Sequence, residues 1–413
     1  MFRKLVTYDE AKNIINQTLK PKPVGTQEIS LLEAHNRVLA QDVTSTLDIP
    51  PFNRSTVDGY AVQAQDTYGA EENQPVKITI CGTVNIGEIP KVTVSKGEAA
   101  EIVTGAPVPE GADAIVMVED TNKEGNDLLI YSSVTQNENI QKKGTDIKNG
   151  ETTLKKGALL GSREIGVLAA LGMAKVKVYK IPTVAVLSTG GEVTEPGREL
   201  PPGKIFDINA YTLSTAVWES GGEPVYSGVV PDETTELRKA LEKALALADM
   251  VLTSGGVSVG PKDIIPQTVD SLGKPGVFIS GIAVKPGKPA TIAMIGEKPV
   301  FSFPGHPTSA LLIFHLLARP VLQVMAGRNP KEKATVKAVA ASRMFSAKGR
   351  RTFVTVKLKL DASKKWIAEP VETGASGAIT TLAKADGFVE IPENQQFIDA
   401  DEEVTVFLFK ENL

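Results

Sequence analysis

The sequence predicts a multidomain α/β protein built around a three-layer α/β/α domain with a mostly parallel sheet. Between residues 179 and 327, strand-like apolar runs alternate with amphipathic helical segments, a pattern typical of parallel sheets with right-handed helical crossovers. The flanking segments, 51–137 and 328–413, consist mostly of short strand patterns and glycine turns, which predicts two separate β domains. A chain of 413 residues has room for about three domains.

Two helices are expected near the N-terminus. Thr7 and Glu10 form a capping box before a helical apolar repeat, and Ser30 with Glu33 repeats the signal for a shorter helix reaching about Leu39. Each helix is expected to begin at its capping residue.

We assign residues 1–50 and 138–178 to an N-terminal connector domain, into which a β domain at 51–137 is inserted. Segment 48–61 contains two prolines and several turn formers, so an irregular loop is expected there. Strand patterns are expected from residue 76 to about 134.

In the central domain, polar and glycine-rich loops follow the predicted strands. These loops are 188–192, the turn at Asp232, 253–263 and 304–307. Ligands of open α/β sheets bind beyond the carboxyl ends of the strands, so these loops are expected to meet at one binding edge. A long apolar helix is expected to begin at Pro307, since proline suits the first helical turn.

The loop at 253–263 is the leading candidate for an anion site. Its sequence Thr-Ser-Gly-Gly-Val-Ser-Val-Gly lies between a buried strand and a helix, where glycines let backbone N–H groups approach an anion. The spacing matches neither the dinucleotide fingerprint nor the P-loop. An ordinary strand-to-helix turn is the alternative. Lys285 and Lys288, in Lys-Pro-Gly-Lys-Pro, add two cations on a stiff loop.

Composition excludes several classes of protein. Lys and Arg total 45 against 49 Asp and Glu, so a net charge of −4 argues against a nucleic-acid or membrane-surface binder. No apolar run is judged long enough to cross a bilayer, and no signal-peptide core is present. The single cysteine, Cys81, excludes an internal disulfide framework and a cysteine zinc site. We expect a cytoplasmic protein.

Nucleophilic catalysis is poorly supported. Of the three histidines, His315 lies in an apolar helix, and nothing in the sequence pairs His306 with a serine and an acid. Glu192, Asp232 and Asp263 lie in strand-end loops, where carboxylates beside phosphates hold Mg²⁺. For Asp232, capping of the following helix is an equally good interpretation.

The order of several motifs resembles that of the molybdopterin molybdenumtransferases, the MoeA and gephyrin E-domain type. The central matches are Ser254-Gly-Gly-Val-Ser-Val-Gly, Lys285-Pro-Gly-Lys-Pro and Pro304-Gly-His-Pro-Thr-Ser. The N-terminal matches are Val57-Asp-Gly-Tyr-Ala, Val103-Thr-Gly-Ala-Pro-Val-Pro and Gly144-Thr-Asp-Ile. The resemblance extends into the C-terminal segment, through Gly374-Ala-Ser-Gly and Ala385-Asp-Gly.

This resemblance implies an extended N-terminal domain, a molybdopterin-binding domain at 179–327 and a β-barrel-like domain at 328–413. It also implies insertion of molybdenum from molybdate into adenylylated molybdopterin, with AMP release and Mg²⁺ or a similar ion. A homodimer with shared active sites and contact with an adenylyltransferase partner are implied too. The implied catalytic residues are Asp58, Thr104, Asp146, Glu192, Asp232 and Asp263, of which the last three would also bind metal. The implied ligand-binding residues are Ser254, Gly255, Gly256, Ser258, Lys285, Lys288, Pro304, His306, Pro307, Ser309, Arg351 and Ser376.

Two positions depart from the family pattern. Gly191 stands where the family commonly has an aspartate, which shifts metal binding in that loop onto Glu192. His306 stands in place of an asparagine, so a titratable ring replaces a neutral amide. Either imidazole nitrogen could also make the amide's hydrogen bond without functional change.

Three rival interpretations remain open at the level of sequence. One is a counterpart that inserts tungstate, another tetrahedral dianion. The second is the preceding molybdopterin adenylyltransferase, although the two β domains argue against an enzyme of one-domain length. The third is a non-enzymatic scaffold of the gephyrin type.

Overall fold

The computed structural model describes residues 5–256, 264–330, 334–371 and 379–409. The chain divides into two compact units, each described here by itself. One comprises Met1–Ile29, Asn36–Ala40 and Lys177–Leu413, and the other comprises Ser30–His35 and Gln41–Val176.

The first unit contains a six-stranded sheet in the order β16-β13-β17-β21-β20-β18. Its strands are β13 (Thr183–Thr189), β16 (Glu223–Val230), β17 (Met250–Ser254), β18 (Pro275–Ser280), β20 (Thr291–Ile295) and β21 (Lys298–Phe303). Strands β16, β13, β17 and β21 are mutually parallel, and β20 runs antiparallel to both of its neighbours. A short parallel pair, β14 (Val193–Thr194) and β15 (Ile205–Phe206), follows β13.

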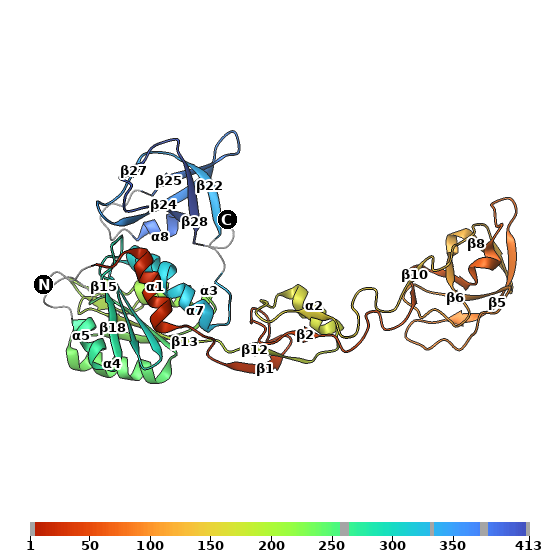
Figure 1. Ribbon diagram of the computed structural model, residues 1–413, viewed down its shortest axis with the longest axis horizontal. Coiled ribbons are helices and arrows are strands. Elements are labelled where there is room, and N and C mark those ends of the chain that lie inside the picture. Colours follow the sequence, from red (N-terminus) through yellow and green to blue (C-terminus); the bar gives the residue numbers. More distant parts are fainter. Residues whose placement is uncertain (1–4, 257–263, 331–333, 372–378, 410–413) are drawn as a thin grey trace. The chain divides into compact units, whose positions relative to one another are not determined.

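Helices cover both faces of this sheet (Figure 1). Helices α4 (Thr234–Leu247) and α5 (Ile264–Ser271) pack on one face around Leu237, Leu241 and Ile265. The other face is covered by α1 (Tyr8–Leu19), α3 (Asn209–Glu219), α6 (Pro307–Ile313) and α7 (Arg319–Met325), the last two joined by a π-helical turn at Phe314–Ala318. This arrangement confirms the predicted three-layer domain with a mostly parallel sheet.

The continuous helix Pro307–Met325 corrects one expectation. By length and composition it is apolar enough to cross a membrane, but 67% of the window that passes this test is buried inside the structure. Its apolar residues pack against the sheet in the same core as α1 and α3. It is therefore explained as a core helix of the α/β domain.

The C-terminal strands close into a barrel-like sheet. They are β22 (Thr335–Ala340), β24 (Arg351–Leu360), β25 (Trp366–Pro370), β26 (Gly387–Ile391) and β28 (Glu403–Leu408), with a small pair, β23 (Met344–Phe345) and β27 (Phe397–Ile398), and the short helix α8 (Thr380–Lys384). The order β24-β25-β22-β28-β26 closes because β26 also pairs with β24. Strand β19 (Val284–Lys285) pairs in parallel with Arg351 and Thr352 at the start of β24.

The second unit is built from short strand pairs and one larger sheet. The sheet has the order β7-β4-β6-β5-β9-β8. Its strands are β4 (Gly59–Val62), β5 (Val76–Val84), β6 (Glu98–Ile102), β7 (Ala114–Met117), β8 (Thr121–Glu124) and β9 (Asp127–Ile130), with 3₁₀ turns at Ala64–Thr67 and Val118–Asp120. The remaining elements are helix α2 (Ser162–Ala170) and the pairs β2 (Val43–Thr44) with β11 (Thr152–Leu154), and β3 (Arg54–Ser55) with β10 (Ile140–Gln141). Strands β1 (Thr26–Ser30) and β12 (Lys175–Tyr179), most of whose residues belong to the first unit, pair with each other.

The capping box at Ser30 does not start a helix. The Ser30 hydroxyl donates to Glu33 at 2.7 Å, yet the chain makes only a turn there. Asn36 adopts a left-handed φ of 60°, and Leu39 then bridges Val178. The prediction was wrong because pairing with a distant strand overrode the local signal. The box at Thr7 does start α1, with both capping hydrogen bonds present.

The segment predicted as an irregular loop contains a central strand. Strand β4 (Gly59–Val62) is fully buried and pairs with both β6 and β7. A Cβ on Gly59 would lie 1.9 Å from the carbonyl oxygen of Val116. The glycine interpreted as a turn former is therefore required for close approach of two strands.

Candidate functional site

Four parallel strands of the central sheet end side by side. Thr189 of β13 is in register with Val230 of β16, and Ser188 is in register with Ser254 of β17, which pairs in turn with Phe303 of β21. The loops after these strands therefore begin at one edge of the sheet. The antiparallel strand β20 starts at this edge as well, because Thr291 is in register with Ser302.

The glycines after β17 allow the backbone to pack closely against the end of β13. Gly255 has a φ of 92°, and a Cβ there would lie 2.2 Å from the carbonyl oxygen of Thr189. Gly255 N donates to the carbonyl of Phe303 at 3.2 Å. A larger residue would therefore displace the start of this loop.

The two lysines of the next loop lie at the same edge, between β18 and β20. Lys285 ends β19 and is exposed, whereas Lys288 is half-buried. Gly287 between them has a φ of 103°, and a Cβ there would lie 2.4 Å from the side chain of Ile313 in α6. The loop is thus packed down on a core helix. A stiff loop holds cations in place at little entropic cost when an anion binds.

Two carboxylates follow neighbouring strands at this edge. Glu192 follows β13 and Asp232 follows β16, and both are exposed. The prediction that Asp232 caps α4 was wrong, since the helix begins one residue later with Glu233 at the N-cap and no side-chain capping bond. Capping therefore does not account for Asp232. Asp263 and Ser258 lie outside the described residues.

Sequence reasoning missed a buried polar pair at the start of α3. The Asp207 carboxylate accepts from the Ser188 hydroxyl at 2.9 Å and from Ala210 N at 3.0 Å. The Asn209 amide donates to Ser254 Oγ at 2.6 Å and to the Gly305 carbonyl at 2.7 Å. A carboxylate and an amide, two residues apart where a helix begins, were the available signal.

The loop after β21 carries the histidine that departs from the family pattern. His306 is exposed and occupies the N-cap position of α6 without a side-chain capping bond. Pro304 is buried, Pro307 is the first residue of α6, and Ser309 is buried in the first turn. The loop therefore presents the His306 ring at the strand-end edge on a fixed backbone.

Comparison with known proteins covers nearly the whole chain. Residues 6–172 match the MoeA N-terminal region (domain I and II), residues 185–324 match a family described as "Probable molybdopterin binding domain", and residues 337–409 match the MoeA C-terminal region (domain IV). The chain belongs to the MoeA family. As a member it is a transferase of molybdenum cofactor biosynthesis.

Relatives in this family align from end to end. The molybdopterin molybdenumtransferase of Nostoc sp. is 34% identical over 96% of this chain and 92% of its own length. That of Haemophilus influenzae is 32% identical over 97% and 98%. The crystal structure of the molybdopterin biosynthesis moea protein from Pyrococcus horikosii is 42% identical, covers 98% of this chain and 100% of its own, and has a TM-score of 0.88.

The MoeA N-terminal region holds three of the residues singled out from the sequence. The structure brings two of them together, because Asp58 Oδ1 accepts from Thr104 N at 2.6 Å and from the Thr104 hydroxyl at 2.8 Å. These two hydrogen bonds, the backbone one first, lower the pKa of Asp58. Asp146 is exposed in a separate turn, where its backbone N–H donates to Ile49.

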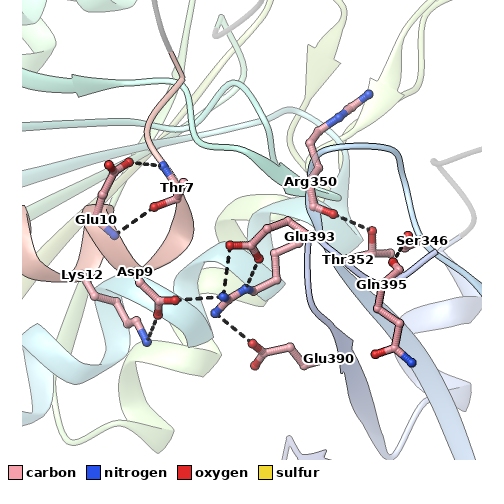
Figure 2. A network of polar contacts seen from close by, with 11 residues as sticks. Thr7, Asp9, Glu10, Lys12, Ser346, Arg350, Thr352, Glu390, Glu393 and Gln395 are labelled. Carbon is pink, nitrogen blue, oxygen red and sulfur yellow. Dashed lines mark hydrogen bonds and ion pairs between the residues drawn. The ribbon is translucent and has the colours of Figure 1, made fainter. Parts of the chain in front are cut away.

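In the MoeA C-terminal region, Arg351 forms ion pairs with three carboxylates. The three acidic residues are labelled in Figure 2. The Arg351 guanidinium contacts Asp9 of α1 at 2.8 Å, Glu393 at 2.9 Å and Glu390 at 3.1 Å. It also lies over the ring of Tyr8, 5.4 Å from the centroid. Three carboxylates more than offset one positive charge, so this arrangement does not favour an incoming oxyanion at Arg351. Ser376 lies outside the described residues.

Arg350 differs from its neighbour in every one of these respects. Its side chain points away from Asp9 and Glu393 (Figure 2), and it makes no ion pair within the described part of the chain. Successive residues entering a strand face opposite sides. If this domain supplies an arginine to an anion, charge and direction favour Arg350.

The described residues contain no group of three or more His, Cys, Asp and Glu side chains arranged to hold a metal. Glu192 and Asp232 are the described part of the expected metal set. Neither carboxylate makes an ion pair with a described residue.

Proposed function

We propose that the chain inserts molybdenum from molybdate into adenylylated molybdopterin and releases AMP, in the cytoplasm and with the help of a divalent cation. The observation that carries the proposal is the strand-end edge of the central sheet. A glycine loop and two carboxylates follow adjacent parallel strands there. Two lysines lie in the loop that precedes the antiparallel strand β20 at the same edge. Family membership supplies the reaction class.

The proposed reaction brings several negative charges together. Molybdate approaches a substrate that already carries phosphates, and the departing AMP carries negative charge as well. Lys285 and Lys288 offset this repulsion, and fixed cations stabilise developing charge better than mobile ones. Gly255 lets the backbone approach the phosphates closely. No covalent intermediate on the protein is required.

Glu192 and Asp232 fit a magnesium ion by their chemistry. Mg²⁺ takes hard oxygen ligands and keeps several waters, so one or two exposed carboxylates suffice. These two follow adjacent strands, and Gly191 contributes none. When bound, the ion would offset phosphate charge. The role of Asp263 in the same set belongs to the proposal.

We further propose a homodimer whose active sites combine residues of both subunits, with Asp58, Thr104 and Asp146 serving the α/β site of the partner. A two-fold dimer carries two such sites. Subunits carrying Asp58→Ala or Asp263→Ala, each inactive alone, should regain roughly a quarter of wild-type activity after exchange. Verified exchange without recovered activity refutes the shared site. Pull-down with the adenylyltransferase tests the proposed partner contact.

The function is tested by AMP release from adenylylated molybdopterin with molybdate, with tungstate, and with neither oxyanion. Wild type should release AMP only with an oxyanion and a divalent cation, and Glu192→Gln should raise the Mg²⁺ concentration required. Lys285→Ala and Lys288→Ala should raise the KM for the oxyanion or pterin substrate, less so at high salt. AMP release without metal or oxyanion refutes the proposal, and formation of adenylylated molybdopterin from ATP indicates the adenylyltransferase. If no AMP is released under any condition, the non-enzymatic scaffold becomes the favoured interpretation.

A further inference from the structure

Asn209 holds two strand-end loops together by one end of its amide. Its Nδ2 group donates one hydrogen bond to the hydroxyl of Ser254, the last residue of β17, and one to the carbonyl of Gly305 after β21. Ser254 Oγ in turn contacts the carbonyl of Pro304 at 3.4 Å. Both amide hydrogens are therefore used within the protein.

The other end of this amide has no partner. Asn209 is 9% exposed, and its Oδ1 makes no hydrogen bond with any described residue. Rotating the amide would not resolve this, because oxygen would then face the Gly305 carbonyl, which is also an acceptor. A buried acceptor without a partner costs about 1–3 kcal/mol, so such an atom calls for an explanation.

Two glycines lie at the contacts of Asn209. Gly255 follows Ser254, Gly305 supplies the accepting carbonyl, and a Cβ built on Gly305 would meet only Gly255 Cα, at 3.8 Å. The two loops thus approach each other through glycines. Oδ1 is closed to solvent in this arrangement, so a ligand group reaches it only when the loop backbones move apart.

We propose that Asn209 Oδ1 accepts a hydrogen bond from an N–H or O–H group of the bound substrate. This inference rests on the proposed function and adds a residue that recognises the organic part of the ligand by a hydrogen bond. The phosphoanhydride oxygens of the substrate, and molybdate at neutral pH, offer acceptors and no donors, so neither satisfies Oδ1. The pterin ring offers N–H donors, and the nucleoside offers an amino group and ribose hydroxyls. Asn209 therefore selects for one of these halves, while the lysine loop handles the anions.

Binding to full-length protein tests the proposal, using AMP and molybdopterin as separate probes and inorganic phosphate as a competitor. The variants are Asn209→Leu, which removes both amide ends at similar size, and Thr212→Val as the matched control. Thr212 lies one turn along α3, and its hydroxyl donates only to Ile208. Thermal melting checks that each variant is folded.

Asn209→Leu should raise the Kd of one of the two probes about ten-fold or more, because the lost hydrogen bond is made to the organic part of the ligand. The concentration of phosphate needed to compete should change by less than about two-fold. Thr212→Val should bind like wild type. Weaker binding of AMP by Asn209→Leu assigns the hydrogen-bond donor to the nucleoside. Weaker binding of molybdopterin alone assigns the donor to the pterin. Folded Asn209→Leu that binds both probes like wild type overturns the inference. A wild type that binds neither refutes the proposed function itself.

A second variant separates a ligand contact from mere positioning of the loops. Asn209→Asp loses both donors but keeps an acceptor oxygen. If AMP is the sensitive probe, 2′-deoxy-AMP and IMP lack its ribose 2′-hydroxyl and amino donors respectively. Wild type and Asn209→Asp should discriminate AMP from one of these analogues, and Asn209→Leu should not. If molybdopterin is the sensitive probe, Asn209→Asp should bind it more tightly than Asn209→Leu. Equal losses in both variants mean that the amide only positions loops, and the inference fails.

Discussion

Two polar clusters in the same compact unit differ in whether their polar groups have hydrogen-bond partners within the protein. The Arg351 cluster surrounds one guanidinium with three carboxylates, so its hydrogen-bond donors are satisfied within the protein. At the strand-end edge, Asn209 is buried with one end of its amide unpartnered. A satisfied cluster contributes to stability, whereas an unsatisfied one retains binding capacity for a ligand. Proximity of charged residues alone does not distinguish the two.

The largest expected effect is at the glycine that shapes the strand-end edge. Gly255→Ala places a Cβ 2.2 Å from the Thr189 carbonyl at a positive φ, so we expect a loss of more than about 3 kcal/mol in stability together with loss of AMP binding. Gly191→Ala is the control in the same region, because nothing lies within 4 Å of its Cβ position. Urea unfolding of both variants measures the difference. Equal stability would show that the loop yields easily.

The next largest effect on stability is expected from removal of the arginine at the centre of the Arg351 cluster. Arg351→Ala leaves Asp9, Glu390 and Glu393 facing one another, and we expect about 2–3 kcal/mol of destabilisation, less than for a fully buried pair because Asp9 is half exposed. Arg350→Ala should change stability by less than about 0.5 kcal/mol. If the KM for molybdate rises in Arg351→Ala and not in Arg350→Ala, the purely structural interpretation of Arg351 is wrong.

The pH dependence of that cluster provides a smaller, signed effect. The hydrogen bond from Arg351 lowers the pKa of Glu393, and hydrogen bonds first from Lys12 and then from Arg351 lower that of Asp9. A lowered folded-state pKa adds stability above the unfolded pKa, which is lost as pH falls through the folded value. The stability difference between wild type and Arg351→Ala should therefore be constant from about pH 8 to 5 and shrink below about pH 4. A difference that grows in acid contradicts this assignment.

The smallest effect concerns an exposed pair in the other unit. Thr104→Val removes the hydroxyl bond to Asp58 but leaves the backbone N–H, which is the larger cause of the lowered pKa. NMR titration should show the pKa of Asp58 rising part of the way to its ordinary value. Thr145→Val is the control, since that hydroxyl donates to a carbonyl. No change in the pKa would mean that the hydroxyl bond is not formed in solution.

Much of the fold could be predicted because it rests on repeating patterns. Alternating strands and helices fixed the central domain, and the chain order of its loops placed them at one edge. The helix predicted after Ser30 does not form, because Leu39 instead pairs with Val178. These two residues are 139 positions apart, so the local sequence does not reveal the pairing. The strand at Gly59–Val62 was missed because its glycine serves close packing, which local sequence does not reveal.

The candidate site could be predicted only in part, for a similar reason. Glycine and lysine loops carry their chemistry in the local sequence, so they were found. Asn209 was counted only as a helix residue, since its partners Ser254 and Gly305 lie on two distant loops. Arg351 was named as a ligand-binding residue by resemblance alone, and a sequence motif does not show the carboxylates that surround it. Counting the partners of buried polar groups requires the folded chain.

The pairing of β19 with β24 makes the C-terminal region part of the lysine loop's support. Val284 and Lys285 are in register with Arg351 and Thr352, and Arg351 N donates to Ala283. A chain cut at residue 327 would leave the backbone beside Lys285 as an open strand edge, prone to pair with other chains. Truncation would thus loosen the loop and invite self-association at once. The C-terminal domain thus supports the lysine loop through this strand pairing, and its deletion is expected to lower both activity and solubility.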